Sequence, residues 1–207
     1  MVGRVKGGKS WYERQSRDHG AKQANKLNLR SRAALKLVEI EQKHRILNKQ
    51  TIALDLGAAP GGWSQVLVKH VKKVVACDLL DIKPIEGVEF IKGDFTDLDV
   101  QSKLMVLTDH QVDLICSDIA PNWSGIKLKD HANMEALMMA VLDFADEYLA
   151  EGGHLLMKCF EFPEAQALIK AIRPSYQKII RYKPPTSRSE STEFYLLALR
   201  KVNSEKK

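Results

Sequence analysis

Aspartates close several short apolar segments of this sequence, at the points where strands of a sheet would end. Asp55 belongs to one such segment, and Asp78, Asp94 and Asp118 end or follow three others. Because an unpaired carboxylate beside a buried sheet is costly, four of them in equivalent places predict a ligand site. A carboxylate after the second strand can pair with ribose hydroxyls, and Asp94 can accept a hydrogen bond from an adenine amino group. The four aspartates therefore predict an adenosine-like ligand that carries a positive charge.

The segment Asp55-Leu-Gly-Ala-Ala-Pro-Gly-Gly-Trp63 lies where a predicted strand turns into a helix, which is where open α/β sheets bind ligands. It lacks the G-x-G-x-x-G fingerprint of dinucleotide sites and the Lys-Ser/Thr of a phosphate-binding loop. Pro60 also has no N–H to offer a pyrophosphate. The turn favours a nucleoside with a small charged tail, such as S-adenosylmethionine. The predicted cofactor-binding residues are Asp55, Gly57, Gly61, Trp63, Asp78, Asp94 and Asp118.

Lys158 lies inside the apolar run Leu155–Phe160, at the predicted ligand-binding end of a strand. A buried lysine at such a place can act as a general base that takes a proton from a bound substrate. Burial and a neighbouring cation favour the neutral amine, whereas nearby carboxylates favour the ammonium form. The sequence does not decide between the two forms, and a structural ion pair is the alternative role.

Hydrophobic periodicity predicts strands that alternate with helices, the pattern of an α/β fold. Such a chain forms a mainly parallel sheet with helices on both faces, and its last two strands form an antiparallel hairpin. Residues 1–49 add a basic extension and helices to a single domain whose core is residues 50–207, and Ser31 is a predicted helix N-cap. The predicted strands are 51–57, 73–78, 88–92, 112–118, 154–160, 177–182 and 193–199, and the predicted helices are 10–25, 31–47, 60–70, 96–107, 130–149 and 163–172.

Composition narrows the class of protein. The 207 residues are 44% hydrophobic, which excludes a disordered chain, and no run approaches about 18 consecutive apolar residues, which excludes a membrane span. Three separated cysteines fit free thiols, and six histidines without close pairing predict no metal site. Residues 1–49 hold 13 Lys and Arg against 4 Asp and Glu, whereas residues 50–207 hold 19 against 22. This basic N-terminal segment predicts contact with RNA, and a solvated tail is the alternative.

Six segments together resemble the FtsJ/RrmJ (RlmE) ribosomal RNA 2′-O-ribose methyltransferases, in order and with similar spacing over about residues 11–199. They are Arg30-Ser-Arg-Ala-Ala-Leu-Lys36-Leu, Asp55-Leu-Gly-Ala-Ala-Pro-Gly-Gly-Trp63-Ser, Ala76-Cys-Asp78-Leu-Leu, Gly93-Asp94-Phe, Ser117-Asp118-Ile-Ala-Pro-Asn122 and Ser191-Thr-Glu193-Phe-Tyr. The resemblance implies a Rossmann-like S-adenosylmethionine-dependent methyltransferase fold, with a seven-stranded, mainly parallel sheet whose last strand is antiparallel. It also implies 2′-O-methylation of a uridine ribose in large-subunit (23S-type) rRNA, on the assembled or assembling subunit. We expect the protein to be a cytoplasmic monomer.

The family uses a Lys-Asp-Lys-Glu tetrad, which Lys36, Asp118, Lys158 and Glu193 match. By this resemblance Lys158 accepts the proton and Asp118 lies near the transferring methyl group. Lys36 supplies a second cation, and Glu193 orients a lysine or the ribose.

RNA contacts are predicted from basic and aromatic residues. The candidates for phosphate contacts, which bring affinity and salt dependence, are Lys22, Lys26, Arg30, Arg32 and Arg188. Among the tryptophans, Trp63 favours a role in the core or the cofactor pocket, whereas base stacking stays open for Trp11 and Trp123.

The chain departs from the family pattern in two places. Ala34-Leu35 stands where aromatic residues are more usual, and Glu161-Phe-Pro163 replaces a small, glycine-containing turn. Two other functions stay open. One is ribose methylation of a tRNA or an mRNA cap, and the other is a non-catalytic RNA-binding role in ribosome assembly.

Overall fold

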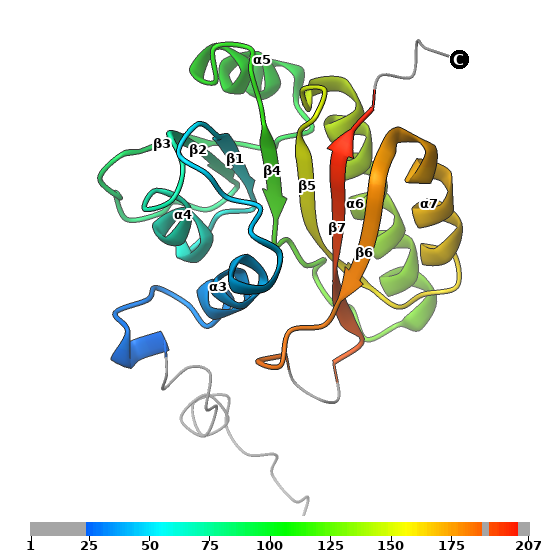
Figure 1. Cartoon of the computed structure of the whole chain (residues 1–207). Coiled ribbons are helices and arrows are strands. Elements are labelled where there is room, and N and C mark those ends of the chain that lie inside the picture. The colour runs from blue at the N-terminus through cyan, green and yellow to red at the C-terminus, as the bar shows by residue number, and fades with distance from the viewer. Residues whose placement is uncertain (1–23, 188–190, 203–207) are drawn as a thin grey trace, which may run out of the picture.

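A seven-stranded sheet forms the centre of the computed structural model, with strand order β3-β2-β1-β4-β5-β7-β6 (Figure 1). The structure describes residues 24–187 and 191–202, so the predicted helix 10–25 falls almost entirely outside it, as do Lys22 and Arg188. The first five strands are parallel to one another, whereas β7 runs antiparallel to its neighbours β5 and β6. The strands are β1 (Ile52–Leu56), β2 (Lys73–Asp78), β3 (Val88–Lys92), β4 (Leu114–Ser117), β5 (His154–Phe160), β6 (Tyr176–Tyr182) and β7 (Glu193–Lys201).

Helices cover both faces of the sheet. One apolar cluster joins Leu54 and Leu56 of β1 to the helices α5, α6 and α7, while a second joins Ala53 of the same strand to α3 and α4. This division follows from the alternation of side chains along a strand, which sends successive residues to opposite faces. The helices are α3 (Ala33–His44), α4 (Gly62–Leu67), α5 (Leu98–Leu107), α6 (Lys127–Tyr148) and α7 (Ala165–Ile172), followed by the 3₁₀ turn η1 (Arg173–Ser175). The predicted fold class is confirmed.

The same alternation gathers charged side chains on the α3/α4 face. Leu156 and Leu197 pack in the cluster under α3 and α4, and Lys158, two residues beyond Leu156, continues that row toward the carboxyl end of β5. Tyr195 belongs to the same cluster. The register of the antiparallel pair sets Tyr195 opposite Lys158 and Glu193 opposite Phe160.

Several element boundaries match the prediction, and others differ. The predicted bounds of β2, β3 and β5 are those observed. Ser31 is not the N-cap of α3: the helix begins at Ala33 after Arg32 and has no side-chain cap. The Ser31 carbonyl accepts from the Ala34 N–H, and its buried hydroxyl has no hydrogen-bond partner. Among the described helices, none is long and apolar enough to cross a membrane.

Candidate active site

Two clefts open along the carboxyl ends of the parallel strands, and Gly57 lines both of them. The first, of about 280 Å³, is lined by the four predicted catalytic residues Lys36, Asp118, Lys158 and Glu193 together with Asp55 and Trp63. The second, of about 320 Å³, is mostly apolar and holds Asp78 and Asp94 among Leu79, Phe95, Ile119 and Leu137. One elongated ligand could therefore lie across Gly57, with a charged end in the polar cleft and a flat apolar end in the other.

Lys158 and Asp118 form a buried ion pair at the centre of the polar cleft. Their Nζ and Oδ1 atoms lie 3.1 Å apart, and the side chain of Lys158 is only 9% exposed. Lys158 Nζ also donates a 2.6 Å hydrogen bond to the backbone carbonyl of Asp118. The pairing of Ser117 with Met157 in β4 and β5 brings the next residue of each strand side by side. The amine is thus fixed by two oxygens of one residue.

Lys36 and Glu193 form a second buried ion pair, from α3 and β7, and the Lys36 amine donates to Glu193 Oε1. Lys36 reaches this position because it lies on the buried side of α3 together with Leu37 and Ile40. Burial raises the pKa of Glu193, but the hydrogen bond and charge of Lys36, with the charge of Lys158, outweigh burial and lower it. Glu193 is therefore ionised at neutral pH.

Tyr195 connects the two ion pairs and was missed by sequence reasoning. Its hydroxyl donates a 2.6 Å hydrogen bond to Asp118 Oδ1, and its ring centroid lies 5.5 Å from Lys36 Nζ. Burial first, and then the charge of Asp118, hold the pKa of Tyr195 well above its ordinary value, so it acts as a neutral donor. The ring also packs against Trp63, with 5.7 Å between centroids. The available signal was its spacing of two residues from Glu193, which puts both side chains on one face of the strand.

Asp55 lies inside β1, one residue before its end and not at the end as predicted, and it is 1% exposed. Its Oδ2 accepts a 2.6 Å hydrogen bond from the Ser64 hydroxyl, while its Oδ1 is buried without a partner. Burial first, and also the charge of Asp118, raise the pKa of Asp55 to about 7. A buried, unpartnered carboxylate oxygen that lines the polar cleft suits a ligand with a positively charged group.

The two aspartates of the apolar cleft are held in different ways. Asp78 accepts hydrogen bonds from the backbone N–H groups of Ala59 and Leu80, both at 2.8 Å, and so ties the glycine turn to the end of β2. Asp94 accepts from the N–H and hydroxyl of Thr96. Both carboxylates line the cleft beside apolar side chains, the arrangement expected for a nucleoside.

The turn between β1 and α4 depends on its glycines. Gly57 has a φ of +74°, and a side chain there would meet Ile119, whose Cγ1 lies 2.1 Å from the place of a Cβ atom. Gly61, with a φ of +98°, precedes α4 and packs against Arg30. Trp63 is buried and donates a 2.8 Å hydrogen bond to the Ala33 carbonyl, which joins α4 to α3.

Comparison with known proteins decides the family. The family described as FtsJ-like methyltransferase matches residues 29–201. The chain belongs to this family.

Named relatives of this FtsJ-like methyltransferase agree with the assignment. Proteins called ribosomal RNA large subunit methyltransferase E from Francisella tularensis subsp. novicida and subsp. tularensis are each 41% identical over 194 residues, covering 92% of this chain and 94% of theirs. The protein of that name from Francisella philomiragia is 40% identical over the same coverage. The crystal structure of a ribosomal RNA methyltransferase from Plasmodium falciparum matches with a TM-score of 0.76 and 30% identity, and covers 84% of this chain and 99% of that one.

The basic residues of this FtsJ-like chain take different positions. The Arg30 guanidinium donates to the carbonyls of Pro60, Lys83 and Pro84, and its backbone N–H donates to Gln65, so it ties the glycine turn to the loop after β2. Lys26 is exposed, and Arg32 lines the polar cleft. In residues 24–187 and 191–202, no group of three or more His, Cys, Asp or Glu side chains is placed to hold a metal ion.

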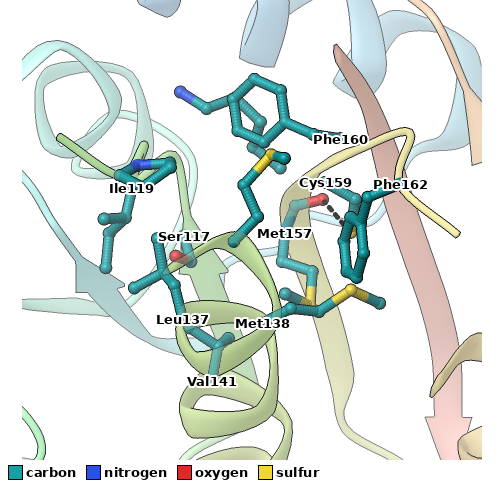
Figure 2. A pocket seen from close by; sticks show the side chains of 12 residues that line it. Ser117, Ile119, Leu137, Met138, Val141, Met157, Cys159, Phe160 and Phe162 are labelled. Atoms are coloured by element: carbon teal, nitrogen blue, oxygen red, sulfur yellow. Dashed lines mark hydrogen bonds between the residues drawn. The ribbon is translucent and has the colours of Figure 1, made fainter. Parts of the chain in front are cut away.

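A small apolar cavity lies behind Lys158, between the ends of β4 and β5 and helix α6. Figure 2 shows its lining, in which Met138, Met157 and Phe162 lie opposite Ile119, with Phe160 at the end of β5. Beside it, Cys159 is buried, and burial raises the pKa of its thiol to about 12. Apart from Lys158, the cavity lining is mostly apolar, and Ser117 and Cys159 are its side chains that carry a hydroxyl or a thiol.

Proposed function

We propose that this protein transfers the methyl group of S-adenosylmethionine to the ribose 2′-hydroxyl of a uridine in large-subunit rRNA. The observation that carries the proposal is the buried amine of Lys158, held by two oxygens of Asp118 in the polar cleft. The names of the similar Francisella proteins support a large-subunit rRNA substrate.

The clefts fit the proposed cofactor. The unpartnered Oδ1 of Asp55 would face its positively charged end, and Asp78 and Asp94 lie in the apolar cleft where its nucleoside would bind. Gly57 lines both clefts, and Ile119 occupies the place where a side chain at this position would lie. When bound, S-adenosylmethionine supplies an electrophilic methyl group on a sulfonium ion.

Lys158 has the position of the proton acceptor. The uncharged amine of Lys158, with its N–H groups facing two oxygens of Asp118, would take the hydroxyl proton on its lone pair as the 2′-oxygen bonds to the methyl carbon and the carbon–sulfur bond breaks. Asp118 holds that nitrogen through its Oδ1, at 3.1 Å, and its backbone carbonyl, at 2.6 Å, so little reorientation is needed during transfer. Lys36, kept in place by Glu193, brings a second positive charge to the same cleft and stabilises the developing negative charge on the ribose oxygen.

The RNA approaches from the side of α3 in this proposal. Lys26 and Arg32, with Lys22 and Arg188 outside the described residues, would contact phosphates. We further propose that the substrate is the assembled or assembling large subunit. The monomeric state and the cytoplasmic location stay predictions.

Methyl transfer to defined RNAs tests the proposal. The purified protein is incubated with tritiated S-adenosylmethionine and, separately, large ribosomal subunits that lack the modification, free rRNA and tRNA. We expect label on the subunits, at a single nucleotide that resists alkaline cleavage because its 2′-oxygen carries the methyl group. Label on a base, or on tRNA in preference to the subunit, would contradict the assignment.

A further inference from the structure

Exposed apolar side chains gather between β4 and the first turn of α6. Trp123 is 56% exposed, Ile126 62% and Leu128 82%. A single exposed leucine is common on protein surfaces, but a cluster of exposed apolar side chains that includes a tryptophan indicates a binding surface. We call these three residues the Trp123 patch.

The loop that carries Trp123 is held in one conformation. The Asp130 carboxylate accepts hydrogen bonds from the N–H and hydroxyl of Ser124, both at 2.7 Å, and from the Gly125 N–H at 3.1 Å. These hydrogen bonds, that of the Ser124 N–H above all, lower the pKa of Asp130, so the carboxylate is ionised and the turn is intact at neutral pH. An exposed aromatic ring on a fixed loop loses little conformational entropy when a partner binds it.

The ring of Trp123 lies one side chain away from the proposed proton acceptor. It meets the ring of Phe160 in a T-shaped contact with 5.3 Å between centroids. The Phe160 centroid in turn lies 5.9 Å from Lys158 Nζ. Phe160 lines the small cavity next to Lys158, so the aromatic pair lies beside the amine at the edge of the polar cleft.

Lysines flank the Trp123 patch. Lys127 and Lys129 are exposed in the first turn of α6, on either side of Leu128. Cations at a helix N-terminus are opposed by the helix dipole, so these lysines do not serve helix stability. Aromatic rings interleaved with exposed lysines are typical of single-stranded nucleic-acid sites, where bases stack on the rings and lysines meet phosphates.

We propose that Trp123 stacks on a nucleobase of the substrate RNA next to the acceptor ribose, while Lys127 and Lys129 contact the adjoining phosphates. This inference rests on the proposed function and deepens it, because it assigns the side of the cleft that receives the base. RNA-binding proteins commonly stack a splayed-out base on an aromatic side chain. A nucleotide whose ribose must reach the buried amine of Lys158 has to be splayed out in this way.

Single-turnover methyl transfer on large ribosomal subunits, at several subunit concentrations, tests this role. We compare the wild type with W123A, W123F and, as a matched control, V106A, which truncates a 63% exposed side chain on α5. W123A should lower the rate at limiting subunit concentration roughly 10- to 100-fold, the range that loss of a base stack produces, with W123F restoring most of it. V106A should match the wild type, and calorimetry should give all four proteins the same affinity for S-adenosylmethionine.

The outcomes separate this inference from the proposed function. A wild type that transfers no methyl group to any RNA ribose contradicts the proposed function. If the wild type is active, a W123A rate within twofold of it, or a W123F rate as low as that of W123A, overturns the stacking role. Equal binding of wild type and W123A to the protein-free rRNA, together with a defect on subunits, would mean that the Trp123 patch meets a ribosomal protein, and this also overturns it.

Discussion

The hydroxyl of Tyr195 donates a 2.6 Å hydrogen bond to Oδ1 of Asp118, the same oxygen that lies 3.1 Å from the Lys158 amine. One carboxylate oxygen is thus shared by the Tyr195 hydroxyl and the Lys158 amine. The β5–β7 register, which sets Tyr195 opposite Lys158, creates this arrangement.

Removing the Tyr195 hydroxyl should slow methyl transfer without weakening the binding of S-adenosylmethionine. In Y195F the ring still packs against Trp63, but Asp118 loses one of its donors and is free to turn away from Lys158. We expect a fall in the methyl-transfer rate of roughly tenfold, the effect of losing a hydrogen bond to a charged group, with unchanged affinity for S-adenosylmethionine. Stopped time courses and calorimetry measure the two quantities. A rate equal to that of the wild type would show that Tyr195 only fills space.

The Lys36–Glu193 pair should contribute stability that depends on pH. The folded-state pKa of Glu193 lies below its ordinary value of 4.5, so the pair stabilises the fold above pH 4.5 and this contribution is lost as the pH falls through the lower, folded value. E193Q should lower the free energy of unfolding by about 3 kcal/mol at pH 7, because it leaves a buried lysine without its counter-ion. The difference from the wild type should shrink in denaturant titrations below pH 4.5.

The matched control for that experiment is D81N, which breaks the exposed Asp81–Lys92 pair. Because solvent screens this pair, D81N should change the free energy of unfolding by less than about 1 kcal/mol at every pH. A loss in E193Q no larger than that in D81N would contradict the buried contribution.

Asp55 should make cofactor binding pH-dependent. Its pKa of about 7 means that the carboxyl is partly protonated near neutrality, and a cationic ligand binds the ionised form better. The affinity of the wild type for S-adenosylmethionine should therefore fall as the pH drops below 7, with release of protons on binding. D55N removes this titration, and since the ligand's own groups titrate alike with both proteins, the difference in calorimetry reports Asp55. Identical pH profiles would rule out this role.

The salt dependence of RNA binding should show whether Lys26 and Arg30 contact RNA phosphates or stabilise the fold. Lys26 is exposed, so K26Q should reduce the slope of log K for RNA binding against log salt by about one. The Arg30 guanidinium already donates to the carbonyls of Pro60, Lys83 and Pro84, which competes with the predicted phosphate contact. R30Q should lower the melting temperature and leave the slope unchanged. If R30Q reduced the salt slope as much as K26Q does, Arg30 would be shown to contact an RNA phosphate.

Much of the fold follows from local pattern. Apolar runs predicted β2, β3 and β5 at their observed bounds. β2 and β5 leave the signature of buried strands in the sequence, whereas β3 is a partly exposed edge strand. The insertion of β7 between β5 and β6 was not predicted, since it depends on pairing between residues far apart in the chain. Ser31 failed as an N-cap because its position against Gly62 of α4, and not its residue type, sets its environment.

The charged residues of the candidate site could be predicted from the sequence, because their residue types alone show that they carry charge. The predicted Lys36, Asp118, Lys158 and Glu193 all line one cleft. Tyr195 was missed because its sequence context is that of a core strand residue, and its role comes from the register with Lys158. Two of the three carbonyls that hold Arg30 depend on the conformation of the loop at residues 83 and 84, which has no hydrophobic periodicity from which to predict it.

Methyl transfer by a Lys158 variant tests the central claim most directly. K158M keeps most of the length of the side chain but cannot accept a proton, and K92M, at an exposed lysine, serves as the control. With tritiated S-adenosylmethionine and large ribosomal subunits, we predict no detectable transfer by K158M, full transfer by K92M, and near-normal cofactor affinity for both. Transfer by folded K158M at the wild-type rate would contradict the assignment of Lys158 as the proton acceptor.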